Sequence, residues 1–174
     1  GDWISISGNI SVWRPSVVAS WAPYALGYWG RSGNDWVWIS YEPFGDIVYH
    51  YGDWGYVEPY GWCWFPGRDW APNHVDWVEW QGSIGWYPSR PRVSVNINFD
   101  QNPRWDRYIW VSNEHFLDKD FYRERTSDPS KRWRGGEPPR DLQRREVPNV
   151  STVETWTGKR APAVQNQEVR RATK

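Results

Sequence analysis

Pairs of tryptophans two positions apart recur along the first hundred residues, and the clearest copy, Trp62 and Trp64, is followed by a Pro-Gly break. Side chains alternate along a β-strand, so both indoles of such a pair lie on one face. Sliding the chain by 26 positions superposes further aromatic residues: Trp36 on Trp62, Trp38 on Trp64, Phe44 on Trp70, Tyr28 on Trp54, Trp54 on Trp80 and Tyr51 on Trp77. The recurrence predicts a structural repeat.

Each copy has the pattern of a β-hairpin, with two short aromatic runs around a turn that contains Gly, Asn or Pro. The copies lie near residues 24–49, 50–75 and 76–90, and the third is shortened. We therefore predict a mainly β fold, in which residues 1–102 form an antiparallel hairpin-repeat domain built as a small barrel or sandwich. Its core is expected to contain Trp36, Trp38, Trp62, Trp64 and Trp86.

Other local patterns refine this prediction. An entry pair of strands is expected in residues 1–22, and alternating apolar residues predict a further strand over 93–99. Pro43 and Pro66 lie in the links between hairpins, so strands are expected to end there. Cys63 is the single cysteine, which excludes an intrachain disulfide, and it should be buried on the strand face opposite to its neighbouring tryptophans.

Residues 103–174 have a different composition. They hold 16 Lys/Arg against 11 Asp/Glu, whereas residues 1–102 hold 5 Arg against 10 Asp/Glu. We predict an extended, mostly irregular basic tail with one or two short helices, one after Asn113 and one beginning at Ser151 and stopping at Gly158. Such a stretch cannot offset its own ordering entropy, so it is expected to lie against its own domain or a partner. The apolar anchors available for a partner are Phe116, Phe121, Trp133 and Trp156.

Three histidines are the obvious candidates for catalysis or metal binding. His50 is expected to hydrogen-bond to a turn, and His115 to be solvated. His74 shares a strand face with Asp76, but two ligands without a third are weak evidence for a metal. Carboxylate pairs are better explained by an acidic solvated face, and no nucleophile elbow or phosphate-binding loop is present. We predict no catalytic residue, no metal, no cofactor and no enzymatic activity.

Exposed aromatic rings offer an alternative, because the C–H face of a pyranose stacks on an aromatic plane. Trp29, Tyr60 and Trp70 lie near predicted turns and would form such a platform, which favours a glycan- or peptidoglycan-binding module as the second hypothesis. Nucleic acid is disfavoured as a partner because acidic residues interrupt the basic ones of the tail. The chain has no run of about 18 apolar residues, so no transmembrane segment is predicted.

Seven ordered phrases resemble a tryptophan-rich bacterial family catalogued as domain of unknown function 6600. They are VWRP (12–15), WAPY (21–24), WVWISYEPFG (36–45), YHYGDW (49–54), GWCWFPG (61–67), WAP (70–72) and GWYP (85–88). The resemblance implies an exported protein with no established activity, and a start at Gly1 without Met fits either processing or trimming. Phe44 and Ile47-Val48 depart from the family pattern, so the chain around Asp46 is expected to be reshaped locally.

These observations together favour a non-enzymatic role. The expected function is that of a structural or accessory subunit of an exported, periplasmic or extracellular bacterial assembly, which docks to protein partners through its tail.

Overall fold

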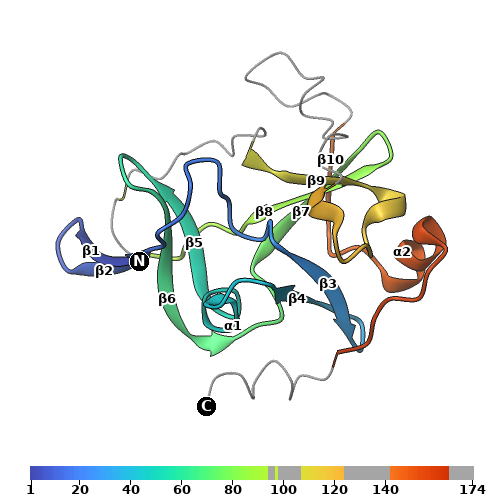
Figure 1. Ribbon diagram of the computed structural model, residues 1–174, viewed down its shortest axis with the longest axis horizontal. Coiled ribbons are helices and arrows are strands. Elements are labelled where there is room, and N and C mark those ends of the chain that lie inside the picture. The colour runs from blue at the N-terminus through green and yellow to red at the C-terminus, as the bar shows by residue number, and fades with distance from the viewer. Residues whose placement is uncertain (94–96, 98–106, 124–141, 165–174) are drawn as a thin grey trace.

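The computed structural model describes residues 1–93, 97, 107–123 and 142–164, apart from the side chains of 143–145. The described strands form two four-stranded antiparallel sheets and one two-stranded sheet, and none of these closes into a barrel (Figure 1). The strands are β1 (Asp2–Ile6), β2 (Ile10–Arg14), β3 (Gly27–Ser32), β4 (Asp35–Ser40), β5 (Tyr51–Val57), β6 (Gly61–Trp70), β7 (Val75–Trp80), β8 (Ser83–Pro88), β9 (Ile109–Ser112) and β10 (Gln143–Arg145). The helices are α1 (Gly45–Val48) and α2 (Val150–Thr157), with the short 3-10 helices η2 (Asn113–His115) and η3 (Phe121–Arg123). The predicted mainly β, antiparallel fold is confirmed.

The three predicted hairpins are β3–β4, β5–β6 and β7–β8, and each lies in a different sheet. Every one of them pairs two tryptophans directly across the strands: Trp29 with Trp38, Trp54 with Trp64, and Trp77 with Trp86. The slide by 26 positions is therefore in register for Trp38 and Trp64 but not for Trp54, which it matched with Tyr28 and Trp80 although its equivalents are Trp29 and Trp77. The turns account for one position of the mismatch, since the second hairpin turns through three residues and the first and third through two.

The paired tryptophans meet in one core. The ring of Trp29 lies 5.0 Å from that of Trp38 and only 4.7 Å from that of Trp77, so the first hairpin packs on the third. The ring of Trp62 lies 5.4 Å from Tyr87, which connects the second hairpin to the third. Each buried aromatic side chain removes about 150–250 Å² from water. A chain with few leucines can therefore be stabilised largely by these rings.

Strand β6 separates two parts of the interior. Trp62 and Trp64 face the main core, whereas Cys63 and Phe65 face a smaller apolar cluster on the other side. Cys63 is fully buried there, and burial raises the pKa of its thiol to about 11. At neutral pH the thiol is protonated and serves as a small apolar group.

The expected strand end at Pro66 is wrong, because β6 continues to Trp70. A register irregularity on the partner strand accommodates the proline: Gly52 pairs with Pro66, but the preceding Tyr51 pairs with Trp70. Gly52 has φ +93°, and a Cβ added to Gly67 would lie only 2.7 Å from the Cα of Gly52. Two glycines facing each other thus let the strands pass at the bend.

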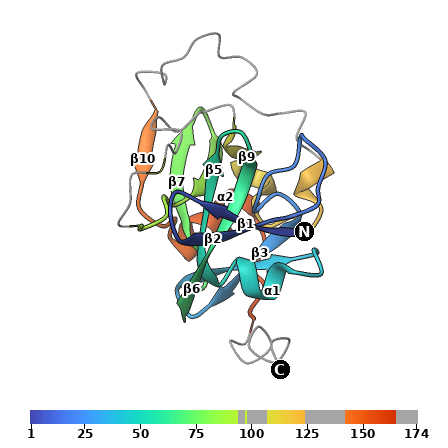
Figure 2. The same ribbon diagram turned by 90° about the vertical axis from the view of Figure 1, so that its left-hand side faces the viewer.

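The tail completes the sheets. Strand β9 pairs with β8, and β10 pairs with β7, so the third hairpin has a tail strand on each side. Further on, the backbone N–H of Arg31 in β3 donates to the carbonyl of Pro162, and the N–H of Val164 donates to the carbonyl of Arg31. The Trp36 indole donates to the carbonyl of Pro148 at 2.7 Å. The view in Figure 2 shows β10 beside β7 and α2 behind the sheets. The core therefore runs across the boundary predicted at residue 102.

The tail helices are short. Asn113 opens η2, but its side chain does not cap it, since Ser112 holds the N-cap position without a side-chain bond. Helix α2 begins two residues earlier than its capping box suggested: Asn149 is the N-cap and accepts from the backbone N–H of Ser151 at 2.9 Å. The helix ends as predicted at Gly158, whose φ of 65° suits glycine.

Replacing Phe116 with alanine tests whether the tail is part of the folded unit. The side chain is 0% exposed, and its ring packs against Trp29, Trp36, Trp77 and Trp86. We expect a loss of about 3–5 kcal/mol in the free energy of unfolding, measured by urea denaturation. Val18→Ala, at an exposed position, is the control and should change it by less than about 0.5 kcal/mol. An unchanged stability in Phe116→Ala would show that residues 1–102 fold without the tail.

Candidate functional site

The aromatic platform predicted from the turns does not form. Trp29 is fully buried at the centre of the core, because alternation in β3 turns it inward. Trp70 is half-buried and its ring stacks on His50 at 5.4 Å. Tyr60 is exposed at the tip of the β5–β6 loop, but no ring contact joins it to the other two. These three residues therefore lie in separate surroundings.

The predicted partner anchors of the tail are mostly used within the chain. Phe116 and Phe121 are buried in the core, the latter 5.4 Å from the ring of Trp86. Trp156 is half-buried on α2 and packs against the same core. Trp133 lies outside the described residues. Phe116 and Phe121 thus hold the tail on its own domain and are not available to a partner. The predicted core tryptophans, Trp36, Trp38, Trp62, Trp64 and Trp86, are all buried.

An exposed group of rings lies elsewhere, formed by Tyr28, Tyr41 and Tyr122, and we call it the tyrosine patch. Tyr28 and Tyr41 have ring centroids 5.7 Å apart, and Tyr41 lies 6.5 Å from Tyr122. Tyr41 is 47% exposed, and the other two rings are half-buried. The patch therefore presents three neighbouring aromatic rings to solvent.

Local structure explains why these three rings face outward. In β3 the inward position of Trp29 turns Tyr28 to the other face. Tyr41 follows β4 and extends its pairing by one bond, from its N–H to the carbonyl of Leu26 at 3.1 Å. Helix η3 buries Phe121, which leaves the next residue, Tyr122, at the surface.

Two cations lie against the patch. The ammonium of Lys119 stands 4.9 Å from the ring centre of Tyr28, and the guanidinium of Arg123 stands 5.7 Å from that of Tyr122. Both distances suit a cation–π contact. The Tyr41 hydroxyl donates to the backbone carbonyl of Lys119 at 2.9 Å, which ties the two chain segments together.

The hydroxyl of Tyr41 has a raised pKa, mainly because of burial, with smaller effects from the neighbouring tyrosines and Asp120. The group therefore stays neutral at physiological pH. Tyr28 and Tyr122 have no hydrogen bond from their hydroxyls to any described residue, so each is open to an outside donor or acceptor. The patch as a whole can offer ring faces, hydroxyls and positive charge to a ligand.

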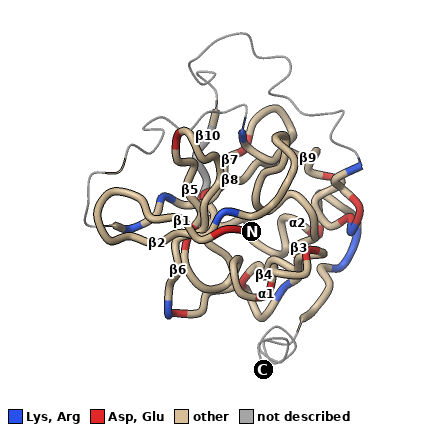
Figure 3. Tube along the Cα trace, turned by 60° about the vertical axis from the view of Figure 1, so that its left-hand side comes forward, with Lys and Arg blue, Asp and Glu red and all other residues tan. Residues whose placement is uncertain are grey.

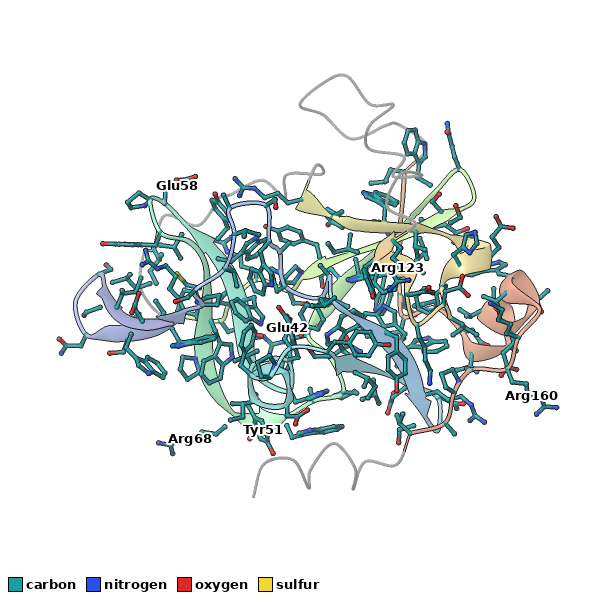
Figure 4. All side chains as sticks on the ribbon, viewed as in Figure 1. Glu42, Tyr51, Glu58, Arg68, Arg123 and Arg160 are labelled. Atoms are coloured by element: carbon teal, nitrogen blue, oxygen red, sulfur yellow. The ribbon has the colours of Figure 1, made fainter. Side chains whose placement is uncertain are left out.

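Glu42 lies in the middle of the molecule among aromatic side chains, whereas Glu58, Arg68 and Arg160 lie at its periphery (Figure 4). Its carboxylate accepts from the indole of Trp21 at 2.5 Å and from the hydroxyls of Tyr49 and Ser40. Burial outweighs these bonds and raises the pKa of the carboxyl. Because its oxygens are bonded to side chains of the same domain, this group fixes the link before α1.

The histidines also have internal partners. The His50 ring contacts the carbonyl of Ala71 through Nδ1 at 2.8 Å, which agrees with the predicted bond to a turn. The Nδ1 of His74 lies 3.2 Å from the carboxylate of Asp53, and the carboxylate of Asp76 accepts from the Ser89 hydroxyl at 3.0 Å. His115 is not simply solvated: its Nδ1 lies 2.7 Å from Asp118.

Asp118 forms the centre of a small charged group. The ammonium of Lys159, beyond α2, reaches it at 2.5 Å, and these bonds together with His115 outweigh burial and lower the pKa of its carboxyl. The pair joins the η2 segment to the end of α2, and both ends are partly exposed. Its role in the described structure is to fasten the tail.

Within the described ranges, no group of three or more His, Cys, Asp or Glu is arranged to hold a metal ion. No described helix is long and apolar enough to cross a membrane. Figure 3 shows basic positions scattered among acidic ones along a mostly uncharged tube.

Comparison with known proteins gives one match. The model of a family described as a family of unknown function, DUF6600, matches residues 1–93. No curated protein and no solved structure matches the chain. The match covers all three hairpins and ends before β9, so the tail strands that complete the third sheet lie outside it.

His50 predicts a specific dependence of stability on pH. Burial lowers the pKa of its imidazole, so between that lowered value and about 6.5 the unfolded chain binds more protons than the folded one. The free energy of unfolding should therefore fall as the pH is lowered through 6.5. In His50→Asn, which keeps a donor near Ala71, this contribution should disappear, as measured by urea denaturation at pH 5 to 8. His115→Asn is the matched control and should keep the His50 contribution; an identical pH profile in His50→Asn and the wild type would contradict the assignment.

Proposed function

The chain belongs to the family of unknown function DUF6600, and on that premise we propose that it is a non-enzymatic structural or accessory subunit that docks to a protein partner. The proposed setting is a bacterial envelope or extracellular assembly, because the resemblance of the tryptophan phrases implies an exported bacterial protein. The described polar clusters support a role without catalysis, because their side chains bond mainly to one another.

The entry hairpin β1–β2 is the observation that carries this proposal. It extends from one side of the molecule (Figure 1), and β1 forms the edge of its sheet. The hairpin is joined to β6 by a short stretch of pairing, in which Trp13 of β2 lies opposite Trp64. Trp3 on β1 is 61% exposed, the most exposed tryptophan among the described residues.

An edge strand and an exposed tryptophan together suit a protein partner. The outer side of β1 has no partner strand among the described residues, and an extended segment of another protein can add to such an edge. Strand β1 also lacks the lysine or proline that often protects an edge from pairing. Tryptophan is enriched among residues that dominate binding energy. We therefore place the docking surface on this hairpin and not on the tail anchors.

Replacing Trp3 with serine tests this docking surface. The protein is purified natively from the producing cells, and its mass in solution is measured by size-exclusion chromatography with light scattering. We expect the wild type to elute as a complex and Trp3→Ser to elute as a monomer, at least tenfold weaker in association. Its melting temperature should change little, since the side chain is mostly exposed. Tyr60→Ser, at another exposed aromatic residue, should keep the complex; a monomeric wild type, or a complex that survives Trp3→Ser, would contradict the proposal.

The tyrosine patch favours a second candidate function, a glycan-binding module. Its rings lie close enough together for a sugar chain to span them, and Tyr41 is nearly half exposed. Aromatic rings backed by a fixed scaffold bind with little loss of side-chain entropy. This candidate replaces the platform expected at Trp29, Tyr60 and Trp70, whose rings are not brought together.

Tyr41→Ala tests the glycan candidate. Soluble peptidoglycan fragments and a panel of oligosaccharides are titrated into the full chain by isothermal calorimetry. We expect at least one ligand to bind, with an affinity reduced about tenfold in Tyr41→Ala, because the central ring of the patch is lost. Tyr60→Ala should bind as the wild type does. Binding that is equal in all three proteins would place the site elsewhere.

A further inference from the structure

We infer that the tyrosine patch is a site for an anionic polysaccharide whose sugars carry carboxylates, and this inference rests on the glycan-binding candidate above. The inference concerns the charge of the ligand, which the rings alone do not determine. It depends on the two cations, Lys119 and Arg123, and on how the fold holds them.

The two cations have no ion pair with any described residue. The nearby carboxylate of Asp118 is occupied by His115 and Lys159. Asp120, between the cations in the sequence, is exposed and brings one negative charge, so the patch keeps a net positive charge. A ligand with regularly spaced carboxylates would complement it.

The position of each cation is set by the tail segment that carries it. Phe121 lies between them in the sequence and is buried against Trp38 and Trp86. The bond from the Tyr41 hydroxyl to the carbonyl of Lys119 fixes the other end of the segment. Both charges are therefore held on the same side as the rings before any ligand arrives, which lowers the entropy cost of binding.

The geometry favours a carboxylated sugar over a flat aromatic ligand. The cations already lie over the rings of Tyr28 and Tyr122, and the rings are tilted by 37° and 79° to Tyr41. Bases stacked in succession need rings with open faces. A sugar chain instead presents C–H groups to Tyr41, hydroxyls to the free tyrosine hydroxyls and carboxylates to the cations.

The test compares a charged ligand with an uncharged derivative of the same sugar chain. Oligogalacturonate and its methyl ester, which have the same sugar rings, are titrated into the full chain at about 50 mM and 500 mM salt. We expect the acid form to bind about tenfold more tightly at low salt, and this preference to shrink at high salt. The double variant Lys119→Gln/Arg123→Gln should bind both forms with equal affinity and keep the affinity of the ester. The matched control, Arg68→Gln/Arg160→Gln, removes two peripheral charges (Figure 4) and should keep the preference.

Each other outcome has a defined meaning. Equal binding of the acid and the ester by the wild type would overturn the inference and leave the glycan candidate standing. Binding of neither form would overturn the inference, and the titration of peptidoglycan fragments and oligosaccharides described above then decides the glycan candidate. Oligoglutamate or single-stranded DNA of the same charge that binds as tightly as oligogalacturonate, and is weakened equally by the double variant, would show a general anion site and overturn the choice of a polysaccharide.

Discussion

The packing of three cross-strand tryptophan pairs into one core is the constraint on which the rest of this structure depends. Each hairpin contributes one directly opposed pair to the core. The ring of Trp29 in the first hairpin contacts those of Trp77 and Trp86 in the third. A single hairpin is at best marginally stable in water, so none of the three is expected to persist alone. The indoles join three separate sheets without closing a barrel. The indole N–H groups of Trp54, Trp64 and Trp86 also donate to backbone carbonyls, as when Trp86 donates to the carbonyl of Tyr24 at 3.0 Å.

The sequence predicted these hairpins well because their signal is local. Period-two tryptophans and Gly-containing turns determine which residues pair and which face is buried, and Cys63 opposite Trp62 and Trp64 follows from the same alternation. The strand break at Pro66 was wrong because it depends on a partner strand: Gly52, fourteen residues away, supplies the irregularity that the proline requires. A proline in the sequence predicts that a backbone hydrogen bond between strands is missing, but it does not show which residue of the partner strand accommodates it.

The candidate site was missed for a related reason. Trp29 was expected in an exposed platform, whereas the structure buries it and turns the neighbouring Tyr28 to the other face of β3. The patch exists because Tyr122 and Lys119 arrive from a segment some eighty residues later, held by Phe116 and Phe121. These phenylalanines looked like partner anchors because the segment around them is short of apolar residues. No local pattern shows that the hairpin core has room for them.

The use of the tail within the fold changes where recognition can occur. Tail strands occupy both sides of the third hairpin, and residues 162–164 lie along β3, so these edges are already paired. Among the strands that the structure describes, β1 of the entry hairpin is paired on one side only, and Trp3 on it is exposed. The tail also carries its cations to the tyrosines of the first hairpin. Packing of the tail on its own domain thus also forms the charged aromatic surface. Any substitution that loosens the packing of Phe121 should therefore displace Lys119 and Arg123 together.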